Sequence, residues 1–317
     1  MSLEKYALCF PGQGSQSVGM GRELFEAFDV AKSVFEEADD ALSSHLTRLM
    51  FEGDESELTL TKNAQPAIMT VSVAALRVLS DSMGVNLNPE CCAGHSLGEY
   101  TALVAANALS FSEAVRLVHK RGEFMQEAVP EGKGSMAATL GMKPEAAKNL
   151  CESVAPDGEV RPANYNSPGQ IVISGLTEYV DKAIAQAKNF GAKRAVKLNV
   201  SAPFHSKFMK PAADKLKLEF ENCKSWNDAK WQIIANVSAK PVRKADEIRE
   251  SLYNQTFNPV LWEDSVGFMC GDLGVNDYFE LGSGEVLAGL IKRCRKGVNI
   301  ISAGNPEKLE EIAKCLH

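Results

Sequence analysis

The sequence lacks three features that would each point to a different class of protein. None of its eight cysteines belongs to a Cys-x-x-Cys pair, and their scattered positions in apolar segments favour buried thiols over disulfides or a zinc site. No apolar run reaches the length that a bilayer span requires, and a net charge of −7 disfavours nucleic-acid binding. We therefore expect no metal, no membrane segment and no nucleic-acid partner.

The first residues also lack a targeting pattern. Residues 1–5 lead directly into an apolar strand pattern, without a basic region and signal core and without an arginine-rich transit stretch. Hydrophobic residues make up 45% and charged residues 24% of the 317 residues, which is ordinary for a globular protein. We expect a cytoplasmic protein, and a monomer because no exposed apolar stripe stands out.

The most informative pattern that is present is Gly-x-Ser-x-Gly at residues 94–98. This pattern is typical of a strained turn between a strand and a helix that exposes a serine nucleophile. Residues 90–93 form a short apolar run fit for a buried strand, and residues 97–106 have the character of a helix. The two glycines leave room for an unfavourable backbone conformation at Ser96, which is therefore the predicted nucleophile.

A serine nucleophile needs a base, and histidine is the usual one because its pKa lies near the working pH. His45 lies in a polar helical stretch, His119 on a helix, and His317 at the last position. His95 directly precedes the serine, so strand alternation predicts that it points elsewhere. His205, where a strand gives way to a helix, is the predicted base, and a surface loop histidine is the alternative.

Arg121 occupies an apolar position on the helix predicted over residues 112–129. The apolar stripe of this helix contains Ala114, Leu117, Val118, Met125 and Ala128. A buried guanidinium without its anion costs about 3–5 kcal/mol. One reading is that the guanidinium reaches solvent or pairs with a structural carboxylate. Because this helix follows the one that begins after Ser96, the other reading is a pocket that binds the carboxylate of an acidic ligand.

The glycine-rich turn at residues 11–16 has no third glycine at the spacing of a dinucleotide site and no Gly-Lys-Ser/Thr of a phosphate loop. Nucleotide binding is therefore not expected. A turn of this kind can present a backbone N–H to a developing oxyanion, with the amide of Leu97 as a second donor. The alternative is a tight connection between a strand and a helix with no chemical role.

The order of predicted elements indicates an α/β fold. Residues 1–129 and 200–317 read as an α/β-hydrolase-like catalytic domain with a parallel sheet covered by helices, beginning with a strand at 6–10 and a helix over 21–40. Further helices are predicted at 66–83, 97–106 and 112–129. Residues 130–199 follow the order βαββαβ, which is typical of a ferredoxin-like unit, here inserted into the larger domain.

Taken together, these residues resemble the malonyl-CoA:acyl-carrier-protein transacylase family, the loading enzymes of fatty acid synthesis. The similarity covers nearly the whole chain, and its specificity comes from the order and spacing of many short motifs. The matching stretches are 10–16 (FPGQGSQ), 94–100 (GHSLGEY), Arg121-Gly122 with Met125, 163–170 (ANYNSPGQ), 200–206 (VSAPFHS), Gln255 with 258–260 (NPV), and 280–282 (ELG) with 286–287.

The resemblance implies a ping-pong transfer of malonyl from malonyl-CoA to the phosphopantetheine thiol of holo acyl carrier protein, without a cofactor. Ser96 would carry the malonyl ester, and His205 would act as base and then as acid. The backbone amides of Gln13 and Leu97 would form the oxyanion hole. Arg121 would hold the malonyl carboxylate through two hydrogen bonds.

The resemblance also implies roles for residues around this centre. Met125 would line the acyl pocket, and the main-chain carbonyl of Gln255 would orient the histidine in place of an acidic third member. Phe204 resembles the malonyl-selective form of its loop rather than the form found with branched extender units. Ser283 departs from the proline that is common in the family, and we expect only a local effect on the loop.

Three other functions stay open on the sequence. A serine esterase or thioesterase would share the serine turn, although Arg121 argues against it. An acyltransferase of polyketide assembly would use the same chemistry, and a catalytically silent scaffold would only bind the carrier. Because carrier proteins are acidic, we expect basic groups at the cleft, from the small domain and from the cluster at 292–296, for which a solvated helix end is the alternative.

Overall fold

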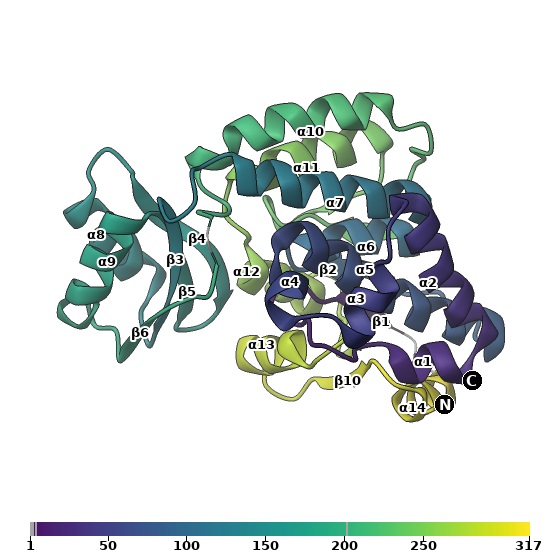
Figure 1. Cartoon of the computed structure of the whole chain (residues 1–317). Coiled ribbons are helices and arrows are strands. Elements are labelled where there is room, and N and C mark those ends of the chain that lie inside the picture. Colours follow the sequence, from purple (N-terminus) through teal and green to yellow (C-terminus); the bar gives the residue numbers. More distant parts are fainter. Residues whose placement is uncertain (1–2, 4, 201) are drawn as a thin grey trace.

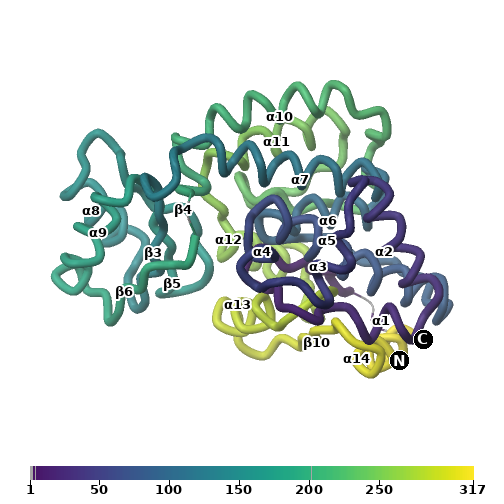
Figure 2. Tube along the Cα trace, viewed as in Figure 1, coloured from purple at the N-terminus to yellow at the C-terminus, as the bar shows by residue number. Residues whose placement is uncertain are grey.

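The structure is a computed structural model that describes residue 3, residues 5–200 and residues 202–317. Residues 1, 2 and 4 of the N-terminal stretch and Ser201 of the 200–206 motif lie outside the described residues. Within the described part, no helix is both long and apolar enough to cross a membrane. Figures 1 and 2 show two sheets that stand apart, each with its own helices.

The larger sheet has six strands in the order β10-β9-β1-β2-β7-β8. These strands are β1 (Tyr6–Phe10), β2 (Cys91–Gly94), β7 (Gln232–Ile234), β8 (Pro241–Val242), β9 (Asp277–Leu281) and β10 (Asn299–Ala303). All neighbouring pairs are parallel except β7 and β8. Every residue of β1 is buried, as expected for a parallel strand that is covered on both faces. The predicted parallel sheet is confirmed, with one short antiparallel edge strand added.

Helices surround this sheet, and α7, α10 and α11 lie together along one side of the molecule in Figure 1. The helices outside the smaller sheet are α1 (Arg22–Ala27), α2 (Asp29–Leu42), α3 (Leu46–Glu52), α4 (Glu55–Thr59), α5 (Thr61–Arg77), α6 (Leu97–Ala105), α7 (Phe111–Glu127), α10 (Lys210–Asn222), α11 (Ala245–Phe257), α12 (Trp262–Gly271), α13 (Val286–Cys294) and α14 (Pro306–Leu316), with short π and 3₁₀ turns at Val78–Ser82 and Lys207–Met209. The single helix predicted over 21–40 is wrong, because Phe28 adopts an extended backbone and separates α1 from α2.

Helices α5 and α7 pack closely at a proline and a glycine. Pro66 lies inside α5, and since proline has no N–H, the carbonyl of Lys62 loses its helical partner. His119 of α7 donates a hydrogen bond from Nδ1 to this carbonyl at 2.8 Å. A Cβ atom on Gly122 would lie 2.5 Å from the Cα atom of Lys62, so this glycine permits the contact. This packing fixes the helix that carries Arg121.

The smaller sheet has four antiparallel strands in the order β4-β5-β3-β6. Its elements are β3 (Gly134–Leu140), α8 (Pro144–Val154), β4 (Val160–Ser167), β5 (Gln170–Leu176), α9 (Thr177–Gln186), a 3₁₀ turn at Ala187–Phe190, and β6 (Arg194–Lys197). In Figure 1, α8 and α9 cover the face turned away from the larger sheet. The element order matches the predicted βαββαβ unit, whereas the domain boundaries at 129/130 and 199/200 stay a prediction.

The segment before α12 joins the two sheets. Tyr165 of β4 donates its backbone N–H to the carbonyl of Val260 at 2.9 Å, and Val260 donates to the carbonyl of Ala163 at 2.8 Å. The smaller sheet is therefore held against the larger body by backbone hydrogen bonds next to β4. This contact brings residues of β3, β4 and β5 to the carboxyl end of the parallel sheet, where ligands bind in open α/β folds.

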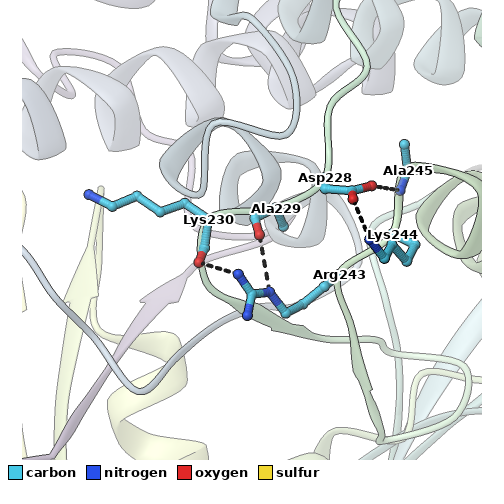
Figure 3. A network of polar contacts seen from close by, with 6 residues as sticks. All are labelled: Asp228, Ala229, Lys230, Arg243, Lys244 and Ala245. Atoms are coloured by element: carbon cyan, nitrogen blue, oxygen red, sulfur yellow. Dashed lines mark hydrogen bonds and ion pairs between the residues drawn. The ribbon is translucent and has the colours of Figure 1, made fainter.

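A polar network fixes the start of α11 (Figure 3). Asp228 accepts a hydrogen bond from the backbone N–H of Ala245, the first residue of α11, at 3.0 Å. Arg243 donates to the carbonyls of Ala229 and Lys230 at 3.2 and 2.9 Å. A carboxylate at a helix N-terminus satisfies a free N–H and opposes the helix dipole. The network anchors the helix that carries Gln255.

Candidate active site

Ser96 lies in the turn between β2 and α6 with a φ angle of 53° and a ψ angle of −103°. A Cβ atom on Gly94 would lie 1.9 Å from the carbonyl carbon of Gly98, so a larger residue at 94 would collide with the backbone. The Ser96 N–H donates to Asn236 Oδ1 at 2.6 Å, and its carbonyl accepts from Gln255 Nε2 at 2.8 Å. The predicted strained turn is present, and two amide side chains hold its backbone.

His205 lies directly against this serine. Its Nε2 atom is 2.7 Å from Ser96 Oγ, and its Nδ1 atom is 2.9 Å from the main-chain oxygen of Gln255. A carbonyl only accepts, so Nδ1 carries the proton and the Nε2 lone pair faces the hydroxyl. Burial, followed by the charge of Arg121, lowers the pKa of His205 to about 3. The imidazole is therefore neutral and able to accept a proton, and it is buried rather than exposed on a loop.

Arg121 is 1% exposed and points at the same hydroxyl. Its guanidinium donates to Ser96 Oγ at 3.0 Å, to Gln65 Oε1 at 2.8 Å and to Gln255 Oε1 at 3.0 Å. Burial lowers the pKa of this guanidinium, and no carboxylate hydrogen-bonds to it among the residues that the structure describes. The solvent-exposed alternative is wrong, and a buried cation of this kind favours an anionic ligand.

His95 also lines the cavity, which corrects the prediction that it points elsewhere. Strand β2 ends at Gly94, so the alternation of a strand does not extend to residue 95. The His95 Nε2 atom lies 2.8 Å from Asn166 Oδ1, and its ring stacks at a tilt on Trp262. Burial lowers the pKa of His95. This histidine hydrogen-bonds to the wall of the cavity, whereas the nucleophile hydrogen-bonds to His205 and Arg121.

The site opens into a cavity of about 560 Å³. Its lining includes Gln13, His95, Ser96, Arg121, Met125, Met136, Asn164, Asn166, Gln170, Val172, Phe204, His205 and Leu290. A second hollow of about 710 Å³ shares Gln13 and residues 198–200 with it, so the two spaces adjoin. Arg293, from the basic cluster predicted to receive the carrier, hydrogen-bonds to Gln170 on this lining. A role of that cluster in docking stays a prediction.

The two predicted oxyanion donors lie on adjacent turns. Leu97 is the first residue of α6, and the first N–H groups of a helix have no partner within it. Gln13 belongs to the 11–16 turn, where a Cβ atom on Gly12 would lie 2.4 Å from the carbonyl oxygen of His95. The glycine turn is therefore pressed against the serine turn, and the role of the two amides stays a prediction.

Four polar residues of the site escaped the sequence reasoning. Gln65 and Asn236 have no motif of their own, and their importance comes from contacts with Arg121 and Ser96. Tyr100 has its ring centroid 5.4 Å from the Arg121 guanidinium carbon. Glu99 is the charged residue of a short, mostly apolar helix, and this alone could have drawn attention to it.

A strained serine, a neutral imidazole and a buried cation at one cavity of an α/β fold define a serine acyltransferase for acidic acyl groups. Residues 8–270 match the acyl transferase domain family. The malonyl CoA-acyl carrier protein transacylase of Bacillus subtilis strain 168 is 50% identical over 315 residues, which are 99% of this chain and 98% of that protein. This chain belongs to the malonyl-CoA:acyl-carrier-protein transacylase family.

Solved structures give the same result. A malonyl-transacylase in complex with its type II polyketide synthase acyl-carrier protein has a TM-score of 0.94 and 42% identity, covering 98% of this chain and 99% of that one. The malonyl CoA-acyl carrier protein transacylase of Coxiella burnetii has a TM-score of 0.95 and 40% identity, covering 98% of both chains. These relatives are transacylases, so a thioesterase or a silent scaffold is not favoured for this chain.

Proposed function

We propose that the protein transfers the malonyl group of malonyl-CoA to the phosphopantetheine thiol of holo acyl carrier protein, through a malonyl ester on Ser96. The observation that carries this proposal is the Arg121 guanidinium, buried and 3.0 Å from Ser96 Oγ. A malonyl group on the serine ends in a carboxylate, and a guanidinium can bind that carboxylate through two parallel hydrogen bonds. The charge of the acyl group then matches the charge of the pocket.

In the first half-reaction, Ser96 Oγ attacks the thioester carbonyl while His205 Nε2 accepts the hydroxyl proton. The backbone amides of Gln13 and Leu97 donate to the oxyanion of the tetrahedral intermediate. When the intermediate collapses, the carbon–sulfur bond breaks and the departing coenzyme A sulfur takes the proton from His205. The Gln255 carbonyl keeps the imidazole oriented, since it accepts from Nδ1 throughout.

The acidic substrate also strengthens the base. The charge of Arg121 is the second cause, after burial, of the low pKa of His205. A malonyl carboxylate bound to Arg121 offsets that charge, so the imidazole becomes more basic when the correct acyl group is bound. An acetyl group brings no carboxylate to the cavity side of Arg121 and leaves the base weaker, which disfavours acetyl-CoA as a donor.

In the second half-reaction, the carrier thiol attacks the Ser96 ester and His205 again transfers the proton. Water must be kept from the ester, and the buried side chains of Met125 and Phe204 on the cavity lining support this role. These two side chains also form part of the walls around the acyl group. The family's printed name and the carrier complex of a relative support acyl carrier protein as the acceptor.

We also infer the wider properties of the protein. The reaction exchanges a thioester for an ester and back without a change of oxidation state, so we propose that it uses no cofactor and no metal. Large exposed hydrophobic side chains in the described part are scattered, at Val18, Leu60, Leu218 and Val286, which supports a monomer. We propose a cytoplasmic location and a catalytic domain of residues 1–129 and 200–317 with residues 130–199 inserted. Light scattering after size exclusion measures the oligomeric state.

Intact-mass spectrometry tests the proposed function. We expect wild-type protein mixed with malonyl-CoA to gain one malonyl group on Ser96, and holo acyl carrier protein to remove it. In Ser96→Ala the rate of acylation by malonyl-CoA should fall by about 10⁴-fold or more. In the exposed control Ser33→Ala the rate should equal that of the wild type. Absence of the adduct, or its loss at the same rate with apo carrier protein or none, would contradict the proposal.

A further inference from the structure

The mechanism above leaves the buried carboxyl group of the site without a role. Glu99 lies on α6, three residues after the nucleophile, and is 1% exposed. Its Oε2 atom accepts from the backbone N–H of Asn236 at 2.9 Å and from Gln255 Nε2 at 3.0 Å, and Ser251 Oγ lies 3.5 Å from Oε1. A buried carboxyl beside the reaction centre is costly unless it serves the site.

The side-chain amide of Gln255 connects Glu99 to the arginine. Its Nε2 atom donates to Glu99 and to the Ser96 carbonyl, and its Oε1 atom accepts from Arg121 Nη2. If the amide were reversed, its NH₂ group would face the guanidinium and its oxygen would face two acceptors. The carboxyl of Glu99 therefore fixes which end of the Gln255 amide faces Arg121.

Before an acyl group binds, the site contains one cation, Arg121, and one carboxylate, Glu99. Glu99 lies one hydrogen-bonded amide away from Arg121, and both side chains are buried. A malonyl ester on Ser96 would add a second carboxylate on the other side of the guanidinium. Two buried negative charges would then share one positive charge, and a surplus buried charge is strongly unfavourable.

Resting on the function proposed above, we propose that Glu99 is the counter-charge of Arg121 in the empty site and takes up a proton when the malonyl carboxylate binds that arginine. The proton comes from solvent and returns to it when the malonyl group leaves. No bond of the acyl transfer changes in this step. Glu99 is thus a positioning residue, because it acts on the substrate through Arg121 and Gln255.

The hydrogen-bond frame can accept this proton without rearranging. Glu99 Oε1 faces the hydroxyl of Ser251, which can accept as well as donate. A proton on Oε1 leaves Oε2 free to keep both bonds from Asn236 and Gln255. Burial raises the pKa of Glu99 to about 7, against the opposing effects of Asn236, Gln255 and Arg121. Proton exchange therefore falls in the neutral range.

The other charged and titratable groups of the cluster do not change charge near neutrality. Arg121 faces Glu99 from α7, and guanidinium groups stay charged in proteins. Tyr100, the next residue of α6, stays neutral because burial raises its pKa. The pKa of His205 is lowered to about 3, and burial also lowers the pKa of His95. From α11 and the segment after β7, Glu99 is faced by neutral hydroxyl, amide and N–H groups.

The sign of the pH dependence follows from this exchange. Malonyl loading takes up a proton, so its equilibrium constant decreases as the pH rises through the pKa of Glu99. A change of one pKa unit corresponds to a tenfold change in the constant. Acetyl loading brings no carboxylate and takes up no proton at Glu99. Ionisation of the released coenzyme A thiol is common to both donors and cancels in their ratio.

The test is the loading equilibrium, measured by intact mass at fixed ratios of acyl-CoA to coenzyme A between about pH 6 and pH 8.5. In the wild type, the malonyl constant divided by the acetyl constant should decrease by about tenfold over this range. In Glu99→Gln the ratio should be independent of pH, because an amide does not titrate. The hydrogen-bond frame is kept in this variant, since the amide oxygen can accept from the same two donors and its NH₂ group can donate to Ser251. Glu99→Ala should weaken malonyl loading at every pH, because Gln255 loses its orientation.

The two proposals fail in different ways. If the wild type forms no malonyl adduct, the proposed function is wrong and the role of Glu99 is wrong with it. If adducts form but the wild-type ratio is independent of pH, or Glu99→Gln keeps the wild-type slope, only the role of Glu99 is overturned. Should Glu99→Gln fail to fold by circular dichroism, proton uptake on malonyl loading of the wild type decides, and its absence in a pH-indicator assay would contradict the proposal.

Discussion

The cavity has two walls of different chemistry. The wall from the six-stranded body carries Ser96, Arg121 and His205. Ser96 hydrogen-bonds to both of the others, and all three hydrogen-bond to Gln255. The wall from the four-stranded sheet presents Met136, Ala138 and Val172, with the neutral amides of Asn164, Asn166 and Gln170. We infer from this contrast that charge recognition and bond chemistry reside in the first wall, whereas the acyl group is enclosed by the second wall together with Met125 and Phe204 of the six-stranded body.

Replacing the cation of the first wall should have the largest effect on selectivity. We expect Arg121→Ala to reduce the preference for malonyl-CoA over acetyl-CoA by about 10²–10⁴-fold, because the loss of a partner from a buried ion pair costs about 3–5 kcal/mol. Initial rates of transfer to holo carrier protein, measured with both donors, give the preference. Arg116→Ala on the same helix is the control, since this exposed arginine donates a hydrogen bond to the carbonyl of Ala41, outside the cavity lining. An unchanged preference in Arg121→Ala would show that the guanidinium does not bind the carboxylate.

Widening the apolar part of the cavity around Phe204 should have a smaller effect on the selectivity between acyl donors. Phe204 is 7% exposed and packs with Met125, Met136 and Val172. We expect Phe204→Ala to increase the use of methylmalonyl-CoA relative to malonyl-CoA, within the roughly 10–200-fold range that one methylene-sized difference can provide. Competition between the two donors, read by mass spectrometry, measures the ratio. The control is Phe208→Ala, which lies outside the cavity lining, and an equal response of both variants would contradict a shape-selecting role for Phe204.

The smallest expected effect is on stability, through the packing of α5 against α7, the helix that carries Arg121. We expect Gly122→Ala to destabilise the protein by about 1–3 kcal/mol, because its Cβ atom would lie 2.5 Å from the backbone of Lys62. In Gly289→Ala, on α13, the added atom meets nothing within 4 Å, and the helix should become more stable by about 0.5–1 kcal/mol. Thermal unfolding compares the two variants. Equal Tm values would mean that α5 and α7 can move apart without a loss of stability.

The chemistry of the first wall was largely predictable from the sequence. The motif around Ser96 specifies a turn through local sterics, and the stripe that contains Arg121 specifies burial through helical periodicity. Strand and helix order likewise predicted both sheets, since the period of apolar residues is a local property. His205 followed from elimination among five histidines. The structure brings the predicted residues together, because each inference depends on residues that are close together in the chain or on a small number of candidates.

The rest depends on contacts between distant segments. Gln65 lies 56 residues from Arg121 in the chain, and Asn236 lies 140 residues from Ser96, so no local pattern marks either amide. The break at Phe28 has no local signal, because the apolar periodicity continues across it. His95 was misjudged because strand alternation was applied to a residue that follows Gly94, the last residue of the strand.

The most direct test of the central claim is a crystal structure of the malonyl-Ser96 ester, trapped without carrier protein. The claim predicts that the malonyl carboxylate forms two hydrogen bonds with the Arg121 guanidinium, at about 2.7–2.9 Å. It also predicts that the ester carbonyl oxygen lies within hydrogen-bond distance of the backbone amides of Gln13 and Leu97, with His205 Nε2 beside the ester oxygen. A malonyl carboxylate that points to solvent, with Arg121 still bound only to Gln65 and Gln255, would contradict the account.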